Sequence, residues 1–166
     1  QDWTTQLGTR LSAQLEIYAD DLGIERVRSA GSSHIFAAGL GDPDVAAEAA
    51  AEFVLAACAF IEEMTEEANV DVTYHAGLSS GSVIAGLLSA SQITYGVFGD
   101  PPRAAMALES IAGRAQILVD ASTADELGPD WILERANDLV DLRGEPGTAQ
   151  VLLGRRRGET EPTEGT

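Results

Sequence analysis

The side chains that could act as nucleophiles or metal ligands are few in this sequence. It has two histidines, His34 and His75, and one cysteine, Cys58. No cysteine or carboxylate accompanies either histidine at the spacing of a zinc site, so the sequence gives no indication of a metal centre. Cys58 lies among apolar residues, where we expect a buried thiol and not a nucleophile.

The charged residues exclude one class of partner. All ten basic residues are arginines, and with 27 acidic residues they give a formal net charge of −17. A field of this sign repels phosphate backbones and anionic headgroups, so nucleic acid is not an expected partner. The sequence has no long apolar run and no signal-peptide pattern, so a membrane is expected only through a segment outside it. The single cysteine fits a reducing, cytoplasmic setting.

The first half of the chain predicts two helices and a hairpin. Residues 7–22 repeat leucines at helical spacing, and residues 27–38 are typical of two short strands around a Gly31-Ser32-Ser33 turn. Asp42-Pro43 opens a second helix as an N-cap followed by proline. Its expected core face comprises Val45, Ala49, Phe53, Phe60, Ile61 and Met64. Its glutamates, which we interpret as a solvated face, are Glu48, Glu52, Glu62, Glu63, Glu66 and Glu67.

The second half predicts several short strands and two helices. Strands are expected within residues 70–87 and over residues 93–98, 117–119, 131–134 and 151–153, and helices over residues 100–111 and 122–127. Trp131 is expected to be a core or rim residue at a strand start. The length and the 45% hydrophobic content suit one domain, residues 1–154, with a disordered tail of acidic residues and arginines over residues 155–166. The element order indicates a mixed sheet with helices packed on it.

Four stretches of the sequence resemble the catalytic domain of class III adenylate and guanylate cyclases. Residues 31–40, GSSHIFAAGL, are similar to the family hairpin G-D-x-Y-M-x-x-x-G-L, and residues 77–86, GLSSGSVIAG, are similar to G-I-H-S-G-x-V-x-A-G. Residues 95–110 resemble the segment around the family's W-G-D, and residues 140–147 resemble its V-x-V-K-G-K-G turn. The resemblance implies an α+β, ferredoxin-like fold with a mainly antiparallel sheet, whose first strand has no counterpart here.

By this resemblance the residues that bind metal in the family are absent. Active relatives hold two Mg or Mn ions with two aspartates, which activate the ribose hydroxyl and neutralise the triphosphate. One aspartate belongs to the missing first strand, so the domain is expected to be incomplete at its N-terminus. The other corresponds to Ser32. A neutral hydroxyl is a poor ligand for a hard dication, so we expect no metal cofactor.

The family's nucleotide-binding positions are also changed. The asparagine and arginine that orient the ribose and stabilise the transition state correspond to Arg103 and Ala107, and alanine donates no hydrogen bond. The two purine-reading positions correspond to Gly96 and Arg28. The basic turn that follows carries Arg143 and Glu145 where the family has lysines.

These substitutions favour a degenerate cyclase-homology domain without catalysis, which acts in signal transduction as a dimerisation or regulatory domain. We expect a homodimer or a partner cyclase-like domain. One alternative is residual or partner-dependent formation of a cyclic nucleotide, the chemistry of a purine nucleotide cyclase and phosphorus-oxygen lyase. Another is a metal-free module in which Arg28, Arg103 and Arg143 bind a nucleotide or other anion. We favour a simpler role for these arginines, pairing with carboxylates across a closed interface.

Overall fold

The first helix is long and lies against the second. The computed structural model describes residues 3–87, 95–136 and 148–156. Helix α1 (Trp3–Leu22) begins four residues earlier than predicted and buries a stripe that includes Leu15 and Ala19. Gly23 adopts a φ of 65° and Ile24 donates its N–H to the Ala19 carbonyl at 2.8 Å, so the helix ends in a left-handed turn.

The predicted hairpin follows α1. Strand β1 (Glu25–Ala30) pairs antiparallel with β2 (Ser33–Ala37), and Gly31, with a φ of 62°, makes the turn with Ser32. A register shift between Arg26 and Arg28 marks a β-bulge. The bulge decides which face of the hairpin each arginine occupies, because opposite residues share a face and successive residues alternate.

The second helix starts differently from the prediction. Asp42 caps a 3-10 turn, η1 (Pro43–Val45), by accepting a hydrogen bond from the Asp44 N–H at 3.2 Å, and α2 (Ala46–Ala68) follows. Val45 was predicted on the core face, which is wrong, since its side chain is 55% exposed. It closes a turn of three residues, so it falls out of register with the 3.6-residue period that buries Ala47, Ala51 and Cys58.

A four-stranded sheet lies between two helices. Its order is β3 (His75–Leu78), β6 (Gln116–Val119), β8 (Gln150–Arg155) and β7 (Trp131–Arg135), with β3 and β6 parallel and the other pairs antiparallel. On β6, Ile117 and Val119 belong to the core shared with α2, while Leu118 packs with residues of α3 (Asp100–Ile111). Alternate residues of one strand therefore serve two cores.

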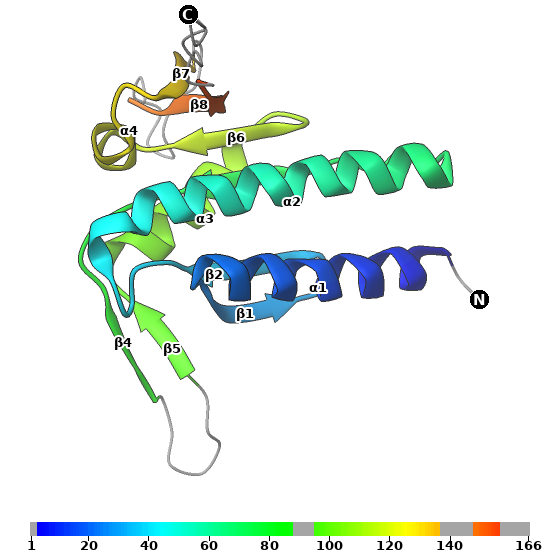
Figure 1. Cartoon of the computed structure of the whole chain (residues 1–166), viewed down its shortest axis with the longest axis horizontal. Coiled ribbons are helices and arrows are strands. Elements are labelled where there is room, and N and C mark those ends of the chain that lie inside the picture. Colours follow the sequence, from blue (N-terminus) through cyan, green and yellow to red (C-terminus); the bar gives the residue numbers. More distant parts are fainter. Residues whose placement is uncertain (1–2, 88–94, 137–147, 157–166) are drawn as a thin grey trace, which may run out of the picture.

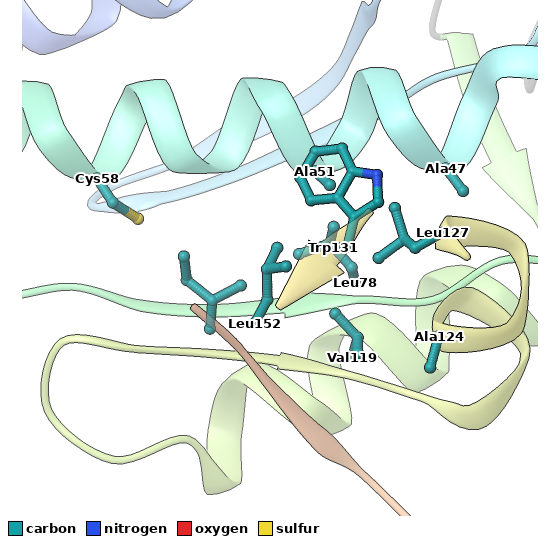
Figure 2. Close-up of a cluster of buried hydrophobic side chains, with 10 residues drawn as sticks. Ala47, Ala51, Cys58, Leu78, Val119, Ala124, Leu127, Trp131 and Leu152 are labelled. Atoms are coloured by element: carbon teal, nitrogen blue, oxygen red, sulfur yellow. The ribbon is translucent and has the colours of Figure 1, made fainter. Parts of the chain in front are cut away.

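The core between α2 and the sheet surrounds Trp131. Figure 2 shows its indole beside Ala51 of α2, with Leu127 of α4 (Ala121–Leu127) and Leu78 of β3 close by. Trp131 is buried at the start of β7, as predicted. On the other side of α2, Phe53 and Ala57 pack with α1 and β2, where the Phe36 and Phe53 rings are 4.5 Å apart. Helix α2 thus joins two cores.

A second hairpin extends from this body. Strand β4 (Ile84–Leu87) pairs antiparallel with β5 (Tyr95–Phe98), and within residues 3–87, 95–136 and 148–156 neither strand pairs with another. Figure 1 shows the hairpin pointing away from α1 and α2. Residues 70–74, included in the predicted strands, are not in a strand, because the chain there turns from α2 into β3.

The predicted α+β fold with a mixed, mainly antiparallel sheet is confirmed. Strand β8 includes Arg155, which was assigned to the tail, and residues 157–166 lie outside the described residues. In the part of the chain that the structure describes, no helix has the length and apolar character needed to span a membrane.

Candidate functional site

The hairpin that carries Ser32 presents no carboxylate at its turn. Ser32 is exposed between Gly31 and Ser33. Two residues on, the Nδ1 atom of His34 lies 2.9 Å from the Ser29 hydroxyl. Partial burial lowers the pKa of His34, and the nearby Arg26 guanidinium lowers it further, so this imidazole is held neutral. Hydroxyls and an imidazole are therefore the polar groups at the turn that the sequence resemblance aligns with the family's metal-binding aspartate.

The β-bulge sends Arg26 and Arg28 to opposite faces of the hairpin. Arg26 lies opposite Phe36, with its guanidinium 5.4 Å from that ring and its Nε 2.9 Å from the Glu16 carboxylate on α1. Arg28 lies opposite Ile35, is exposed, and has no carboxylate partner among the described residues. Arg26 therefore links the hairpin to α1 by an ion pair. The guanidinium of Arg28 makes no ion pair within the described residues, so it is available to bind an anion.

Helix α3 carries Arg103 and Ala107, the two residues that the sequence resemblance aligns with the family's catalytic asparagine and arginine. Arg103 and Ala107 are one helical turn apart and so lie on the same side of the helix. The guanidinium of Arg103 is paired with the Asp100 carboxylate at the start of α3, and both side chains are exposed. This pair lies within one helix.

The remaining predicted site residues fall on β5 or outside the described residues. Gly96 lies on β5 opposite Gly86 of β4, and it is buried. Strand β5 contacts both β1 and α3, so Arg28, Gly96 and Arg103 stand on neighbouring elements. Arg143 and Glu145, with the turn that contains them, lie outside the described residues.

The residues brought together do not fit a pair of divalent cations. Within the described ranges, no three His, Cys, Asp or Glu side chains gather in the way that a metal ion requires. Hard dications need several oxygen ligands, and the charge that offsets them normally comes from carboxylates. The hairpin turn offers only the Ser32 and Ser33 hydroxyls.

His75 and Cys58 have structural roles. The Nδ1 atom of His75 lies 2.9 Å from the Ala112 carbonyl and 3.0 Å from the Gly113 carbonyl, so its N–H satisfies carbonyls at the end of α3. Burial raises the pKa of the Cys58 thiol to about 12, which makes it a weak nucleophile at neutral pH. Nearby, the Tyr74 hydroxyl donates to the Glu62 carboxylate at 3.0 Å.

A polar cluster around Asp120 was not found from the sequence. Asp120 caps α4, accepting from the Thr123 N–H at 2.9 Å, the Thr123 hydroxyl at 2.6 Å and the Ser122 hydroxyl at 3.0 Å. The Ser79 hydroxyl, after β3, also donates to this carboxylate. Partial burial alone raises the pKa of Asp120, but these hydrogen bonds outweigh it and hold the pKa below its usual value. The sequence pattern that could have predicted this cluster is an aspartate directly before a helix, where it is a common N-cap.

A second cluster joins distant parts of the chain. The Arg155 guanidinium lies 2.6 Å from the Glu52 carboxylate, 3.3 Å from the Glu48 carboxylate and 5.3 Å from the centre of the Trp131 ring. No local pattern links the end of β8 to the first turns of α2, so the sequence alone gave no signal for this contact.

The comparisons with known proteins agree on one family. The family model described as the adenylate and guanylate cyclase catalytic domain matches residues 5–154. An adenylate cyclase of Mycobacterium tuberculosis is 28% identical over 149 residues, which are 89% of this chain and 33% of that protein. The chain therefore spans about a third of the length of this curated relative.

Solved structures show the same fold. The guanylate cyclase domain of RhGC from Catenaria anguillulae, in complex with GTP, has a TM-score of 0.79 at 22% identity, covering 89% of this chain and 82% of that chain. The adenylyl cyclase CyaB from P. aeruginosa has a TM-score of 0.77 at 18% identity, covering 92% and 83%. The chain belongs to the adenylate and guanylate cyclase catalytic domain family.

Proposed function

We propose that this chain is a cyclase-homology domain without cyclase activity, which acts in signal transduction as a dimerising regulatory domain. The observation that carries the proposal is the hairpin turn: Ser32 stands exposed where the family resemblance places a metal-binding aspartate. Without that carboxylate, two cations at this turn would lack the charge that balances them. We therefore expect no metal cofactor.

Helix α3 supports the same conclusion. The methyl group of Ala107 has no donor for charge that develops on a phosphate, and the guanidinium of Arg103, one turn earlier, is already paired with Asp100. Removing one donor of this kind typically costs about 10²- to 10³-fold in kcat. Together with the loss at Ser32, these changes leave no complete set of catalytic groups.

The decisive test is an assay for cyclic AMP and cyclic GMP with ATP or GTP and with Mg²⁺ or Mn²⁺. The proposal predicts no product above background. A variant that introduces the family residues at the three aligned positions, Ser32→Asp with Arg103→Asn and Ala107→Arg, serves as the matched comparison. Product from the unmodified chain that disappears in both Ser32→Ala and Arg103→Ala would instead establish a residual cyclase.

The regulatory role requires assembly with a second cyclase-like domain. Among the similar solved structures is a non-canonical dimeric guanylyl cyclase domain of the RhoGC fusion protein from Blastocladiella emersonii, with a TM-score of 0.76 and 22% identity. Similar monomeric structures are also known. We propose a homodimer for this chain, in the cytoplasm, where a free buried thiol such as Cys58 is ordinary. Sedimentation that shows only a monomer at high concentration contradicts the assembly part.

A second candidate is a metal-free anion-binding module. The observation that favours it is Arg28, which is exposed and has no carboxylate partner in the described part of a strongly acidic chain. Calorimetric titration with ATP, GTP and cyclic AMP tests this function. Saturable binding that is lost in Arg28→Ala but kept in Arg114→Ala, whose side chain pairs with Asp71 far from the hairpin in sequence, supports it. No signal at millimolar ligand rejects it.

A further inference from the structure

The first hairpin has a free edge. Strand β1 pairs with β2 on one side, and within residues 3–87, 95–136 and 148–156 no strand pairs with it on the other. Strand β5 contacts β1 without pairing with it. Because β2 packs on α2 through the Phe36 and Phe53 rings, β1 is the outer strand of the hairpin (Figure 1), and most of its residues are exposed. Its outer backbone N–H and C=O groups are therefore available to another strand.

A groove of about 550 Å³ runs along α1 beside this strand. All but one of the residues that line it have small side chains, and the set is Thr5, Gly8, Thr9, Ser12, Ala13 and Glu16. The Arg26 guanidinium of β1 donates to the Ser12 hydroxyl and the Ser12 carbonyl, each at 3.2 Å, and pairs with the Glu16 carboxylate. The groove therefore adjoins β1 and leaves room for the side chains of a strand added there.

The charges on β1 do not block this edge. Natural proteins often protect a free strand edge with charged side chains. Arg26, however, is turned onto α1, and the β-bulge leaves Arg28 on the opposite face of the hairpin. After the bulge, Arg28, Ser29 and Ala30 pair in regular register with β2. This part of β1 can therefore continue a sheet.

Arg28 indicates the chemistry of the segment that fits. In an added strand, the residue opposite Arg28 shares its face, and the neighbouring residues point the other way, toward the groove. Arg28 is exposed and has no carboxylate partner in the described part of the chain, so a carboxylate opposite it forms a charge-assisted pair. The net charge of −17 repels a segment with many carboxylates. The fitting segment is apolar on one face and carries a single carboxylate on the other.

We propose that β1 binds an extended peptide segment of another protein as a third strand of the hairpin, with apolar side chains in the α1 groove and one carboxylate on Arg28. In this mode of recognition, backbone hydrogen bonds supply affinity, and contacts to alternate side chains supply specificity. The inference goes beyond the proposed function, because it depends neither on the loss of catalysis nor on a homodimer.

A short synthetic peptide of alternating valine and threonine, with its central threonine replaced by glutamate, is the probe. Fluorescence anisotropy of the labelled peptide should show saturable binding with a dissociation constant below about 1 mM. Lysine in place of the glutamate should weaken binding by about fivefold or more. The glutamate peptide with methylated backbone nitrogens cannot pair as a strand and should not bind. Equal binding of the methylated peptide, or no binding of the unmodified peptide up to about 1 mM, overturns the inference.

A substitution on α1 tests the groove. Gly8→Leu fills it and should weaken peptide binding by about tenfold or more. Nothing lies within 4 Å of a Cβ atom at Gly8, and leucine favours a helix more than glycine does, so the variant should fold. The matched control is Gln14→Leu, on the same helix but not among the residues that line the groove, and its dissociation constant should stay within about threefold of the parent chain. Equal weakening by both variants contradicts the groove.

A charge reversal tests the pairing with Arg28. In Arg28→Glu, the lysine peptide should bind more tightly than the glutamate peptide, which is the reverse of the parent chain. An unchanged preference overturns the assigned carboxylate.

Sedimentation distinguishes a peptide from a second copy of the chain at this edge. Self-association that is lost in Gly8→Leu, together with no binding of the peptide, would mean that β1 pairs with another copy, and it overturns the inference. The cyclase assay tests the loss of catalysis independently of every one of these results.

Discussion

The sheet body and the two hairpins of this domain differ in how deeply their side chains are buried. In the sheet body, β3, β6, β8 and β7 with α2 and α3, side chains such as Leu118 and Val119 are fully buried. In β1–β2 and β4–β5, none of the side chains that the structure describes is fully buried. Packing therefore restricts the residues of the sheet body more strongly than it restricts exposed positions of the hairpins, such as Ser32.

The two regions also differ in how much room the structure leaves for a change of side chain. Gly77 on β3 leaves no room for a side chain because α3 packs directly on it: a Cβ atom there would lie 2.2 Å from the Ala105 carbonyl oxygen and 2.6 Å from the Glu109 nitrogen. Ser32 is exposed at a hairpin turn, at the position that the sequence resemblance aligns with a family aspartate. A substitution at this turn is therefore expected to leave the packing of the sheet body unchanged.

Gly77→Ala should give the largest effect. The added methyl group meets backbone atoms of α3, which cannot move aside as a side chain can, so we expect a loss of about 3 kcal/mol in the free energy of unfolding. Chemical denaturation measures it. The matched control is Gly86→Ala on β4, where nothing lies within 4 Å of the new Cβ and the loss should stay below about 1 kcal/mol. Equal losses at both glycines would contradict the distinction between the two regions.

Asp120→Ala should give the next largest effect. It removes the cap of α4 and leaves the hydroxyls of Ser79 and Thr123 without their acceptor, at a cost of about 2 kcal/mol at neutral pH. Because the folded pKa of Asp120 is lowered, its contribution is complete above the unfolded pKa of about 4 and is lost as pH falls through the folded pKa. The difference in stability between parent and variant should therefore narrow in acid. A constant difference would refute the role of the ionised carboxylate.

Ala115→Gly should stabilise the protein slightly. Ala115, in the loop before β6, has a φ of 53°, a conformation that favours glycine. Its N–H donates to the Tyr74 carbonyl at 3.0 Å, which holds the conformation in place. Relief of this strain should raise the free energy of unfolding by about 0.5 to 1 kcal/mol, measured as an increase in Tm. Ala121→Gly, at an exposed position in the first turn of α4, is the control and should lower it.

Ser32→Ala should have the smallest effect. The side chain is exposed at a turn, and no hydrogen bond to it is present within residues 3–87, 95–136 and 148–156. The free energy of unfolding should change by less than about 0.5 kcal/mol. A loss above about 1 kcal/mol would mean that Ser32 stabilises the turn. It would contradict the interpretation that serine at this position has no structural role of its own.

Local patterns predicted most of the elements and the family. Asp100-Pro101-Pro102 placed the start of α3 at Asp100, and the Gly31-Ser32-Ser33 turn placed the β1–β2 hairpin. The predicted start of the second helix was wrong at Val45, which closes a 3-10 turn. The register of a helix depends on how its first turn winds, and the local sequence pattern does not specify this. The candidate site residues on β1, β5 and α3 came from the family resemblance, and their roles remain predictions.

The sequence by itself determined the family and the order of helices and strands, because each of these is a matter of residue type and short-range spacing. Only the tertiary structure decided the strand order β3-β6-β8-β7, the separation of Arg26 from Arg28 by a bulge, and the contact of Arg155 with Trp131 and Glu52. These features depend on contacts between distant segments, whose register is set by how the whole core packs.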